Sequence, residues 1–408
     1  MITSISNATV LDLTGTEATL VPDQQLVIED GRIRSVGAAQ QVHDRESITI
    51  DAGGRVVMPG LIDGHVHVTA YEVDLSRLED VPASYRAFRS AELLQGMLDR
   101  GFTTVRDVGG ADVGLARAVG EGRVSGPRLI FGGRALSQSG GHGDGRSPGR
   151  DHHDDCCESL STIADGVDEA LRAARNELRR GAHHIKIMLG GGVASPTDKI
   201  SDLQYSPEEI RAAVLAATNA GKYVAGHAYT TAAVRQGLEN GVRSIEHGNL
   251  MDESVFGLFA ERDAYYVPTL VAYQAMGEAG TSIGLTADNV RKNAQVIERG
   301  LATLEAADRA GLKIVFGTDL LGELQSQQNR EFTIRKEVQS AESIIRSATT
   351  VAAELIGMAG EVGVLAPGAV ADLLIIDGNP LEDVAVLADP AKTLRAVITN
   401  GSIHHCDL

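Results

Sequence analysis

Cysteine is scarce in this sequence, which has three among 408 residues. Cys156 and Cys157 are adjacent and Cys406 lies near the C-terminus, so the chain has no disulfide framework of the kind found in small secreted proteins. No run approaches the ~18 apolar residues that a membrane span requires. The first residues also lack the basic start and apolar stretch of a secretory signal. We therefore expect a cytoplasmic protein.

Positively charged residues are also few. The chain has 37 Lys and Arg residues against 55 Asp and Glu residues, so its formal net charge is −18. A chain of this charge repels the phosphates of nucleic acids and of anionic membranes, so neither is expected as a partner. Hydrophobic residues make up 43% of the sequence, which is ordinary for a globular protein with a full core. The length allows one large domain and a smaller one.

Both ends of the chain have the pattern of short strands joined by turns. Five stretches alternate β-branched with other residues and contain or end in glycine turns. They are residues 4–15, 25–37, 47–60, 371–380 and 394–403. Because chain termini often lie close together, we expect the two β-rich ends to pair with each other.

The middle of the chain alternates short apolar runs with amphipathic helical stretches. In residues 206–220, for example, Ser206 is a typical N-cap, Pro207 follows at the first helical position and Glu209 completes a capping box. The apolar runs number eight and are predicted strands. They are residues 55–68, 103–110, 127–133, 183–189, 222–229, 243–248, 264–270 and 312–319. Eight such units favour a (β/α)₈ TIM barrel over a doubly wound sheet, so the predicted fold class is α/β.

A long segment, residues 137–159, interrupts this alternation with Gly, Asp and His and no periodicity. Loops of this length in compact domains are usually functional or disordered. Because it follows the third predicted strand, the segment would lie on the catalytic face of a barrel.

Ionisable residues recur at the ends of the predicted strands. His65 and His67 stand two residues apart, so they point to the same side of the first strand and can bind one ion together. The carboxyl ends of barrel strands converge on one mouth. The other ligand-type residues at strand ends are Lys186, His227, His247 and Asp319. Core packing alone does not explain six convergent residues of this kind.

Lys186 stands inside an apolar run, where an unpaired ammonium is costly to bury. An ammonium cannot bind a metal, but a lysine that has reacted with CO2 carries a carbamate whose two oxygens can bridge two ions. The alternative is a lysine that reaches the surface or pairs with an acidic neighbour. Asp319 could bind a metal or move the proton of an attacking water, and its alternative is an N-cap of the next helix.

Six segments of the chain resemble the amidohydrolase superfamily. They are PGLIDGHVH, GRALSQSGGHGD, IKIMLGGGVASPTD, VAGHAY, IEHGNL and FGTDLLGE. The first is typical of the superfamily. The GRALSQSGGHGD and GGGVASPTD segments are similar to a branch of Xaa-Pro dipeptidase-like and metal-dependent carboxypeptidase-like enzymes, near the imidazolonepropionase group. The likeness covers nearly the whole chain and implies a composite β-sandwich of residues 1–57 and 361–408 around a barrel of residues 58–360.

The resemblance also implies roles for the six residues at the strand ends. His65 and His67 match ligands of the more buried metal, and His227 and His247 match ligands of a second metal. Lys186 matches the carboxylated bridge between them, and Asp319 the acid/base. Histidine and carboxylate ligands suit zinc, manganese or cobalt, with zinc our first expectation.

Three further residues are candidates for substrate binding or catalysis. The resemblance implies that His142 binds the substrate or polarises its carbonyl. Tyr229 stands two residues after His227, so it faces the same mouth and could donate to a developing oxyanion. Arg146 could clamp a substrate carboxylate, although a solvated loop charge explains it equally well.

The predicted protein is therefore a homo-oligomeric binuclear-metal amidohydrolase acting on a small-molecule substrate. The expected substrate is a dipeptide or N-acyl amino acid with a free carboxylate. One alternative is hydrolysis of a cyclic amide, or of a xenobiotic amide or carbamate, on the same centre, and another is a non-catalytic metabolite-binding barrel. A second metal site at His152, His153, Cys156 and Cys157 is not expected, because adjacent cysteines chelate poorly.

Overall fold

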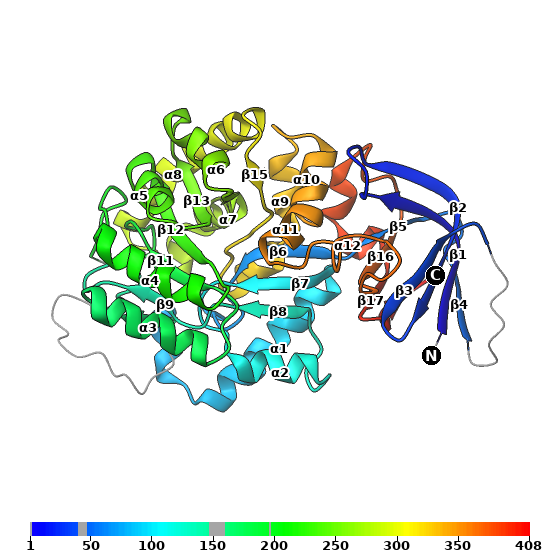
Figure 1. Cartoon of the computed structure of the whole chain (residues 1–408), viewed down its shortest axis with the longest axis horizontal. Coiled ribbons are helices and arrows are strands. Elements are labelled where there is room, and N and C mark those ends of the chain that lie inside the picture. Colours follow the sequence, from blue (N-terminus) through cyan, green and yellow to red (C-terminus); the bar gives the residue numbers. More distant parts are fainter. Residues whose placement is uncertain (1, 40–46, 147–159, 196) are drawn as a thin grey trace.

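The computed structural model of the chain describes residues 2–39, 47–146, 160–195 and 197–408. Its strands fall into a sheet built from both chain ends and two parallel sheets built from the middle of the chain (Figure 1). The neighbouring residues His152, His153, Cys156 and Cys157 lie outside the described residues. Within the described residues, no helix is both long and apolar enough to cross a membrane.

The two ends of the chain share one eight-stranded sheet. Its order is β18-β17-β16-β5-β1-β2-β3, and β4 pairs with β1. The seam between the ends is the antiparallel pair of β5 and β16, in which Val57 faces Ile375. The strands are β1 (Ile2–Asp12), β2 (Thr19–Glu29), β3 (Arg32–Gly37), β4 (Ser47–Asp51), β5 (Val56–Pro59), β16 (Leu373–Ile376), β17 (Leu394–Thr399) and β18 (Ser402–Cys406).

The strands of the middle segment pair in parallel throughout. A three-stranded sheet contains β6 (Leu61–Val66), β7 (Phe102–Asp107) and β8 (Arg128–Phe131). A seven-stranded sheet has the order β10-β9-β11-β12-β13-β14-β15. Its strands are β9 (Ala135–Ser137), β10 (Ser161–Ile163), β11 (Ile185–Met188), β12 (Val224–Thr230), β13 (Ser244–Leu250), β14 (Tyr265–Val267) and β15 (Lys313–Ile314).

Each of the eight predicted apolar runs overlaps a strand, which confirms the α/β class with parallel sheets. The first run is split at Gly60, because β5 joins the sheet of the chain ends while β6 begins the parallel part. Hydrogen bonds join the two parallel sheets at both edges of the three-stranded one, next to β15 on one side and next to β11 on the other. Gly64 N donates to Phe316 O at 2.7 Å, and His183 N donates to Phe131 O at 2.8 Å.

Helices follow most of the parallel strands and cover them (Figure 1). The largest apolar cluster lies where β11, β12 and β13 meet α4, α5, α7 and α8, with Ile187 and Ile245 fully buried. The helices are α1 (Ala83–Asp99), α2 (Val113–Gly120), α3 (Val167–Arg179), α4 (Pro207–Asn219), α5 (Thr231–Glu239), α6 (Phe256–Glu261), α7 (Leu270–Ala279), α8 (Ala287–Arg309), α9 (Arg330–Arg335), α10 (Ala341–Ser347), α11 (Thr350–Leu355) and α12 (Pro390–Thr393).

The predicted start of α4 is confirmed in detail. Ser206 accepts from Glu209 N, Glu209 caps the Ser206 backbone in return, and Pro207 is the first helical residue.

We expect Ser206→Ala to lower the free energy of unfolding by about 1 kcal/mol, because a backbone N–H loses its acceptor. Denaturant titration measures this, with Ser206→Asn as the control that keeps a cap. Equal stability of the two variants would contradict the assignment.

Candidate metal centre

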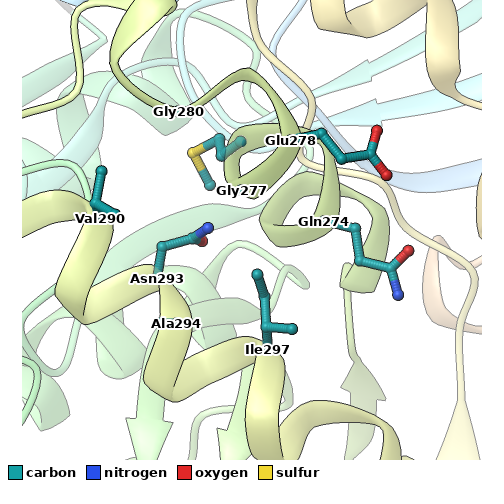
Figure 2. Close-up of a pocket in the computed structure, with 9 residues that line it drawn as sticks. Gln274, Gly277, Glu278, Gly280, Val290, Asn293, Ala294 and Ile297 are labelled. Carbon is teal, nitrogen blue, oxygen red and sulfur yellow. The ribbon is translucent and has the colours of Figure 1, made fainter.

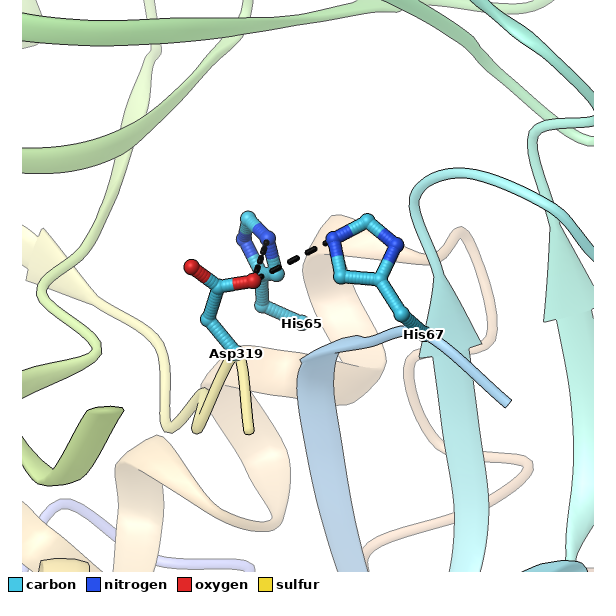
Figure 3. Close-up of side chains that lie close together, drawn as sticks. All are labelled: His65, His67 and Asp319. Carbon is cyan, nitrogen blue, oxygen red and sulfur yellow. Dashed lines mark ion pairs between the residues drawn. The ribbon is translucent and has the colours of Figure 1, made fainter. Parts of the chain in front are cut away.

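Two strand ends bring together His65, His67 and Asp319. His65 belongs to β6, His67 follows that strand, and Asp319 follows β15. Asp319 Oδ1 lies 3.3 Å from His65 Nε2 and 3.2 Å from His67 Nε2 (Figure 3). One ligand atom from each of the three residues lies within 4.8 Å of the others. The arrangement leaves two imidazoles and one carboxylate directed at a common point.

The backbone around Asp319 is shaped to allow this approach. Asp319 N donates to His65 O at 2.8 Å, and Asp319 has a φ of 52°, in the left-handed region that side chains rarely adopt. A Cβ at Gly317 would lie 2.9 Å from His65 Cβ and 2.4 Å from Val267 Cγ1. A glycine is therefore required where the segment after β15 passes β6.

Lys186, His227 and His247 come to the same place from β11, β12 and β13. The ring centroids of His65 and His247 are 5.0 Å apart, and those of His227 and His247 are 4.6 Å apart. Lys186 is 2% exposed. The structure thus gathers the residues from β6, β12, β13 and the segment after β15, with a buried lysine on β11.

In both His65 and His67, the ring nitrogen Nδ1 lies within hydrogen-bonding distance of an oxygen of the protein. His65 Nδ1 lies 2.7 Å from Glu246 Oε2, and His67 Nδ1 lies 2.8 Å from Gly109 O. Both acceptors call for a proton on Nδ1, which leaves Nε2 of each ring to face Asp319. That is the arrangement a metal-binding histidine requires.

The histidines of β12 and β13 are held in a similar way. His247 Nδ1 lies 2.8 Å from Tyr273 OH and 2.9 Å from Thr269 Oγ1. His227 Nε2 lies 3.2 Å from Gly191 O. His247 and Thr269 both have positive φ, at 75° and 49°. Unusual backbone angles of this kind concentrate at functional sites.

The charges of the cluster shift its pKa values. Burial acts to raise the pKa of Asp319, but His65, His67 and His247 oppose it and hold that pKa well below its usual value. Burial lowers the pKa of Lys186 to about 8, against the opposing pull of nearby carboxylates. Burial also lowers the pKa values of His227 and His247. Asp319 is therefore an anion at neutral pH, and the two histidines are neutral.

His142 lies against this cluster. Its ring stacks on that of His227, with centroids 4.1 Å apart, and its Nδ1 lies 3.1 Å from Ser195 Oγ. A Cβ at Gly192 would lie 2.0 Å from the His142 ring. The glycines of the segment after β11 therefore allow close approach of the backbone to this ring.

Tyr229 also reaches the cluster, whereas Arg146 is engaged within its own loop. Tyr229 OH and Tyr273 OH are 2.9 Å apart, and the Tyr229 ring stacks on His247 with centroids 5.2 Å apart. Burial raises the pKa of Tyr229, so its hydroxyl stays a potential donor. Arg146 pairs with Asp144, with Nη2 2.6 Å from Oδ2.

Several residues that support the cluster were not predicted. Asp63, for example, accepts from Thr318 Oγ1 at 2.6 Å and Gln328 Nε2 at 2.8 Å, beside the segment that carries Asp319. The available signal was a charge inside an apolar strand, the same one that drew attention to Lys186. The unpredicted residues in such positions include Asp63, Arg106, Asp107 and Glu246.

The residues present fit divalent metal ions. Imidazole nitrogens and carboxylate oxygens are the donors that zinc, manganese and cobalt bind, and His65, His67 and Asp319 offer one such atom each within 4.8 Å. The backbone and side-chain partners described above each contact one ring nitrogen and so orient the imidazole. Metal-binding histidines commonly have such a partner.

A pocket of about 440 Å³ lies elsewhere, between α7 and α8 (Figure 2). Apolar side chains line most of it, and none of the clustered residues takes part. On its inner side, Asn293 Nδ2 donates to Tyr273 O at 2.9 Å. Its lining residues are Gln274, Met276, Gly277, Glu278, Gly280, Val290, Asn293, Ala294 and Ile297.

Comparison with known proteins gives consistent matches. Residues 56–403 match the amidohydrolase family. The chain is 30% identical over 400 residues to ochratoxinase from Aspergillus niger, covering 93% of this chain and 82% of that protein. A prolidase complexed with N-methylphosphonate-L-proline is 45% identical, with a TM-score of 0.96 and coverage of 100% of both chains. A Xaa-Pro dipeptidase with methionine bound in its active site is 29% identical, with a TM-score of 0.88 and coverage of 99% of this chain and 100% of that chain.

The parallel α/β fold and the ligand-type side chains at the carboxyl ends of its strands place the protein among the α/β enzymes whose active sites lie at that end of the sheet. Within this class, the protein is a member of the amidohydrolase family and a hydrolase whose relatives act on amide bonds. The resemblance inferred from the sequence is thus confirmed. The family is generally metal-dependent, and the His65, His67 and Asp319 group agrees with that.

Proposed function

We propose that the protein is a binuclear-metal amidohydrolase that cleaves the amide bond of dipeptides or N-acyl amino acids with a free carboxylate. The observation that carries this proposal is the convergence of His65, His67 and Asp319 with distances of 3.2–3.3 Å between their facing atoms. A buried lysine and two further histidines on neighbouring strands support a second ion.

The proposed ligands divide into two sets. His65 and His67 would hold one ion and His227 and His247 the other, with Asp319 and a carboxylated Lys186 as the anionic ligands. Lys186 supports a carbamate because its lowered pKa of about 8 leaves a larger share of the neutral amine that reacts with CO2. When bound, two divalent ions acidify a water molecule and polarise a carbonyl group.

The chain's own residues supply the proton transfers and orientation. Asp319 is ionised and can accept the proton of the attacking water, then deliver it to the leaving nitrogen. Tyr229 keeps its proton and can donate to the carbonyl oxygen as negative charge develops there. His142, whose Nδ1 contacts Ser195, has Nε2 left to contact the substrate. Arg146 is proposed as a partner of the substrate carboxylate only if its pair with Asp144 opens.

The substrate class is supported by similarity to the prolidase that was crystallised with N-methylphosphonate-L-proline, at 45% identity over the whole chain. Proline or another apolar residue on the leaving side is our first expectation. The second candidate is hydrolysis of a cyclic or xenobiotic amide or carbamate, and similarity to ochratoxinase over 93% of the chain favours it.

We also infer that the two parallel sheets form a closed (β/α)₈ barrel, which the hydrogen bonds from both edges of the three-stranded sheet to the other sheet support. The sheet of the chain ends is proposed to be part of a β-sandwich domain of residues 1–57 and 361–408, although β5, which belongs to this sheet, continues to Pro59. A cytoplasmic location and a homo-oligomeric assembly remain predictions.

The metal content provides the first test of this function. We expect purified protein to hold close to two divalent ions per chain, because six ligand-type residues converge, and elemental analysis measures this. Removal of the ions by a strong chelator should abolish hydrolysis of a panel of dipeptides and N-acyl amino acids, and zinc or manganese should restore it. One ion or fewer per chain after growth in metal-supplemented medium would refute the two-metal site.

A second test addresses the carboxylate of the substrate. Amidating it should lower kcat/KM by about 10³-fold or more, because buried polar groups of the site then lose their partner. Removing one methylene from the neighbouring side chain should cost only ~1–3 kcal/mol. Kinetics on a dipeptide, its amide and its shortened analogue give the comparison. Equal turnover of a peptide and its amide would favour the cyclic or xenobiotic substrate.

A further inference from the structure

A fully buried ion pair lies directly behind His65. Arg106 of β7 and Glu246 of β13 are both 0% exposed, and Arg106 Nη2 lies 2.8 Å from each oxygen of the Glu246 carboxylate. The pair spans the interior between the two parallel sheets, since β7 belongs to one and β13 to the other. The function proposed above uses neither residue.

The Arg106 guanidinium is held by several rigid groups. Its Nε donates to Gly64 O at 2.5 Å, and its Nη1 lies 3.2 Å from Ser244 Oγ and 3.4 Å from Tyr223 OH. Not every buried arginine of this chain has its hydrogen-bond donors satisfied in this way. Arg335 is equally buried, yet its Nη1 and Nη2 have no hydrogen-bond partner among the described residues. Arg106 is therefore fixed in place, and it fixes Glu246 in turn.

Glu246 also contacts Ser244 and His65. Ser244 Oγ donates to Oε1, while Oε2 lies 2.7 Å from His65 Nδ1. A carboxylate paired with a guanidinium is ionised and can only accept hydrogen bonds. His65 Nδ1 must then carry a proton, and Nε2, which lies 3.3 Å from Asp319 Oδ1, is the nitrogen that faces the centre.

We propose that Glu246, clamped by Arg106, is a positioning residue that fixes the ring orientation and tautomer of His65 and thereby strengthens metal binding. This inference rests on the proposed function, because it assigns His65 to a metal. A carboxylate on the far nitrogen of a metal-bound histidine orients the ring and makes it a better ligand. An ion pair with only a structural role would affect stability and leave metal affinity unchanged.

The test measures zinc affinity rather than turnover. The full-length chain is freed of metal and titrated with Zn²⁺ against a chromophoric chelator. Glu246→Gln should weaken zinc binding at the site that contains His65 by about 10–100-fold, as is usual when such a partner is lost. Asp372→Asn is the matched control, because Asp372 is also buried and also pairs with an arginine, with Arg128 Nη2 3.1 Å from its Oδ2, beside the sheet of the chain ends. It should lower stability and leave zinc affinity unchanged.

A second measurement covers the case in which Glu246→Gln does not fold. Nitrogen-15 NMR of the metal-free wild-type chain, with the His65 signals assigned from a His65→Asn variant, reports the tautomer. We expect the proton on Nδ1. A proton on Nε2 alone, or a folded Glu246→Gln chain with wild-type zinc affinity, would overturn the inference. Wild-type protein that binds zinc but cleaves no amide would instead contradict the proposed function and leave this inference standing.

Discussion

Replacing Asp319 by asparagine should lower turnover by about 10²–10⁴-fold, the range expected when a general acid/base is lost. The carboxylate is an anion at neutral pH because the neighbouring histidines hold its pKa well below the usual value. Asparagine has nearly the same shape but cannot accept a proton from water. Steady-state kinetics on metal-loaded enzyme measure the effect.

Two controls separate proton transfer from metal binding and from folding. Metal content of Asp319→Asn should be determined in the same samples, because Asp319 is also a proposed ligand. Asp372→Asn provides the matched variant, since Asp372 is a buried carboxylate directly before β16 that accepts from Asn400 N at 2.6 Å. It should retain turnover. Near-normal turnover of Asp319→Asn with both ions bound would move the proton transfer to another group, with His142 the first candidate.

Lys186→Ala should lose at least one ion per chain and nearly all activity. The physical reason is that a carbamate would supply two oxygens and one negative charge between the two ligand sets. Short carboxylic acids such as acetate or propionate carry the same two oxygens and charge, so adding them should restore measurable turnover. Elemental analysis and kinetics with and without the acid give the two measurements.

Lys292→Ala provides the matched control for this prediction. Lys292 is also buried, and its Nζ donates to Asp198 O at 2.6 Å. As an ordinary buried lysine it should affect stability, keep both ions and show no rescue by acids. The same behaviour in Lys186→Ala, or a bare ammonium at Lys186 in a crystal structure with both ions bound, would refute the carbamate.

The parallel strands and the helix starts could be predicted from sequence because their signals are local. An apolar run of β-branched residues or a Ser206–Glu209 capping box depends on a few neighbours only. The convergence of residues at strand ends could be predicted because parallel α/β folds bring the carboxyl ends of all their strands to the same end of the sheet. His65, His67 and Asp319 accordingly lie together in the structure.

The supporting contacts could not be predicted, because they join residues that are far apart in sequence. Glu246 contacts His65 from another sheet, and nothing in the pattern of either strand specifies that partner. Arg146 was a plausible anion clamp by type, but its neighbour Asp144 occupies its guanidinium.

The seam between β5 and β16 has a consequence for the order of folding. Val57 emerges early in synthesis, whereas its partner Ile375 emerges only after the whole parallel part of the fold. Until then one edge of β5 has no strand beside it, and unpaired edges promote aggregation. Contacts between such distant segments also form slowly. We therefore expect efficient production of the enzyme to depend on shielding of this edge on the nascent chain.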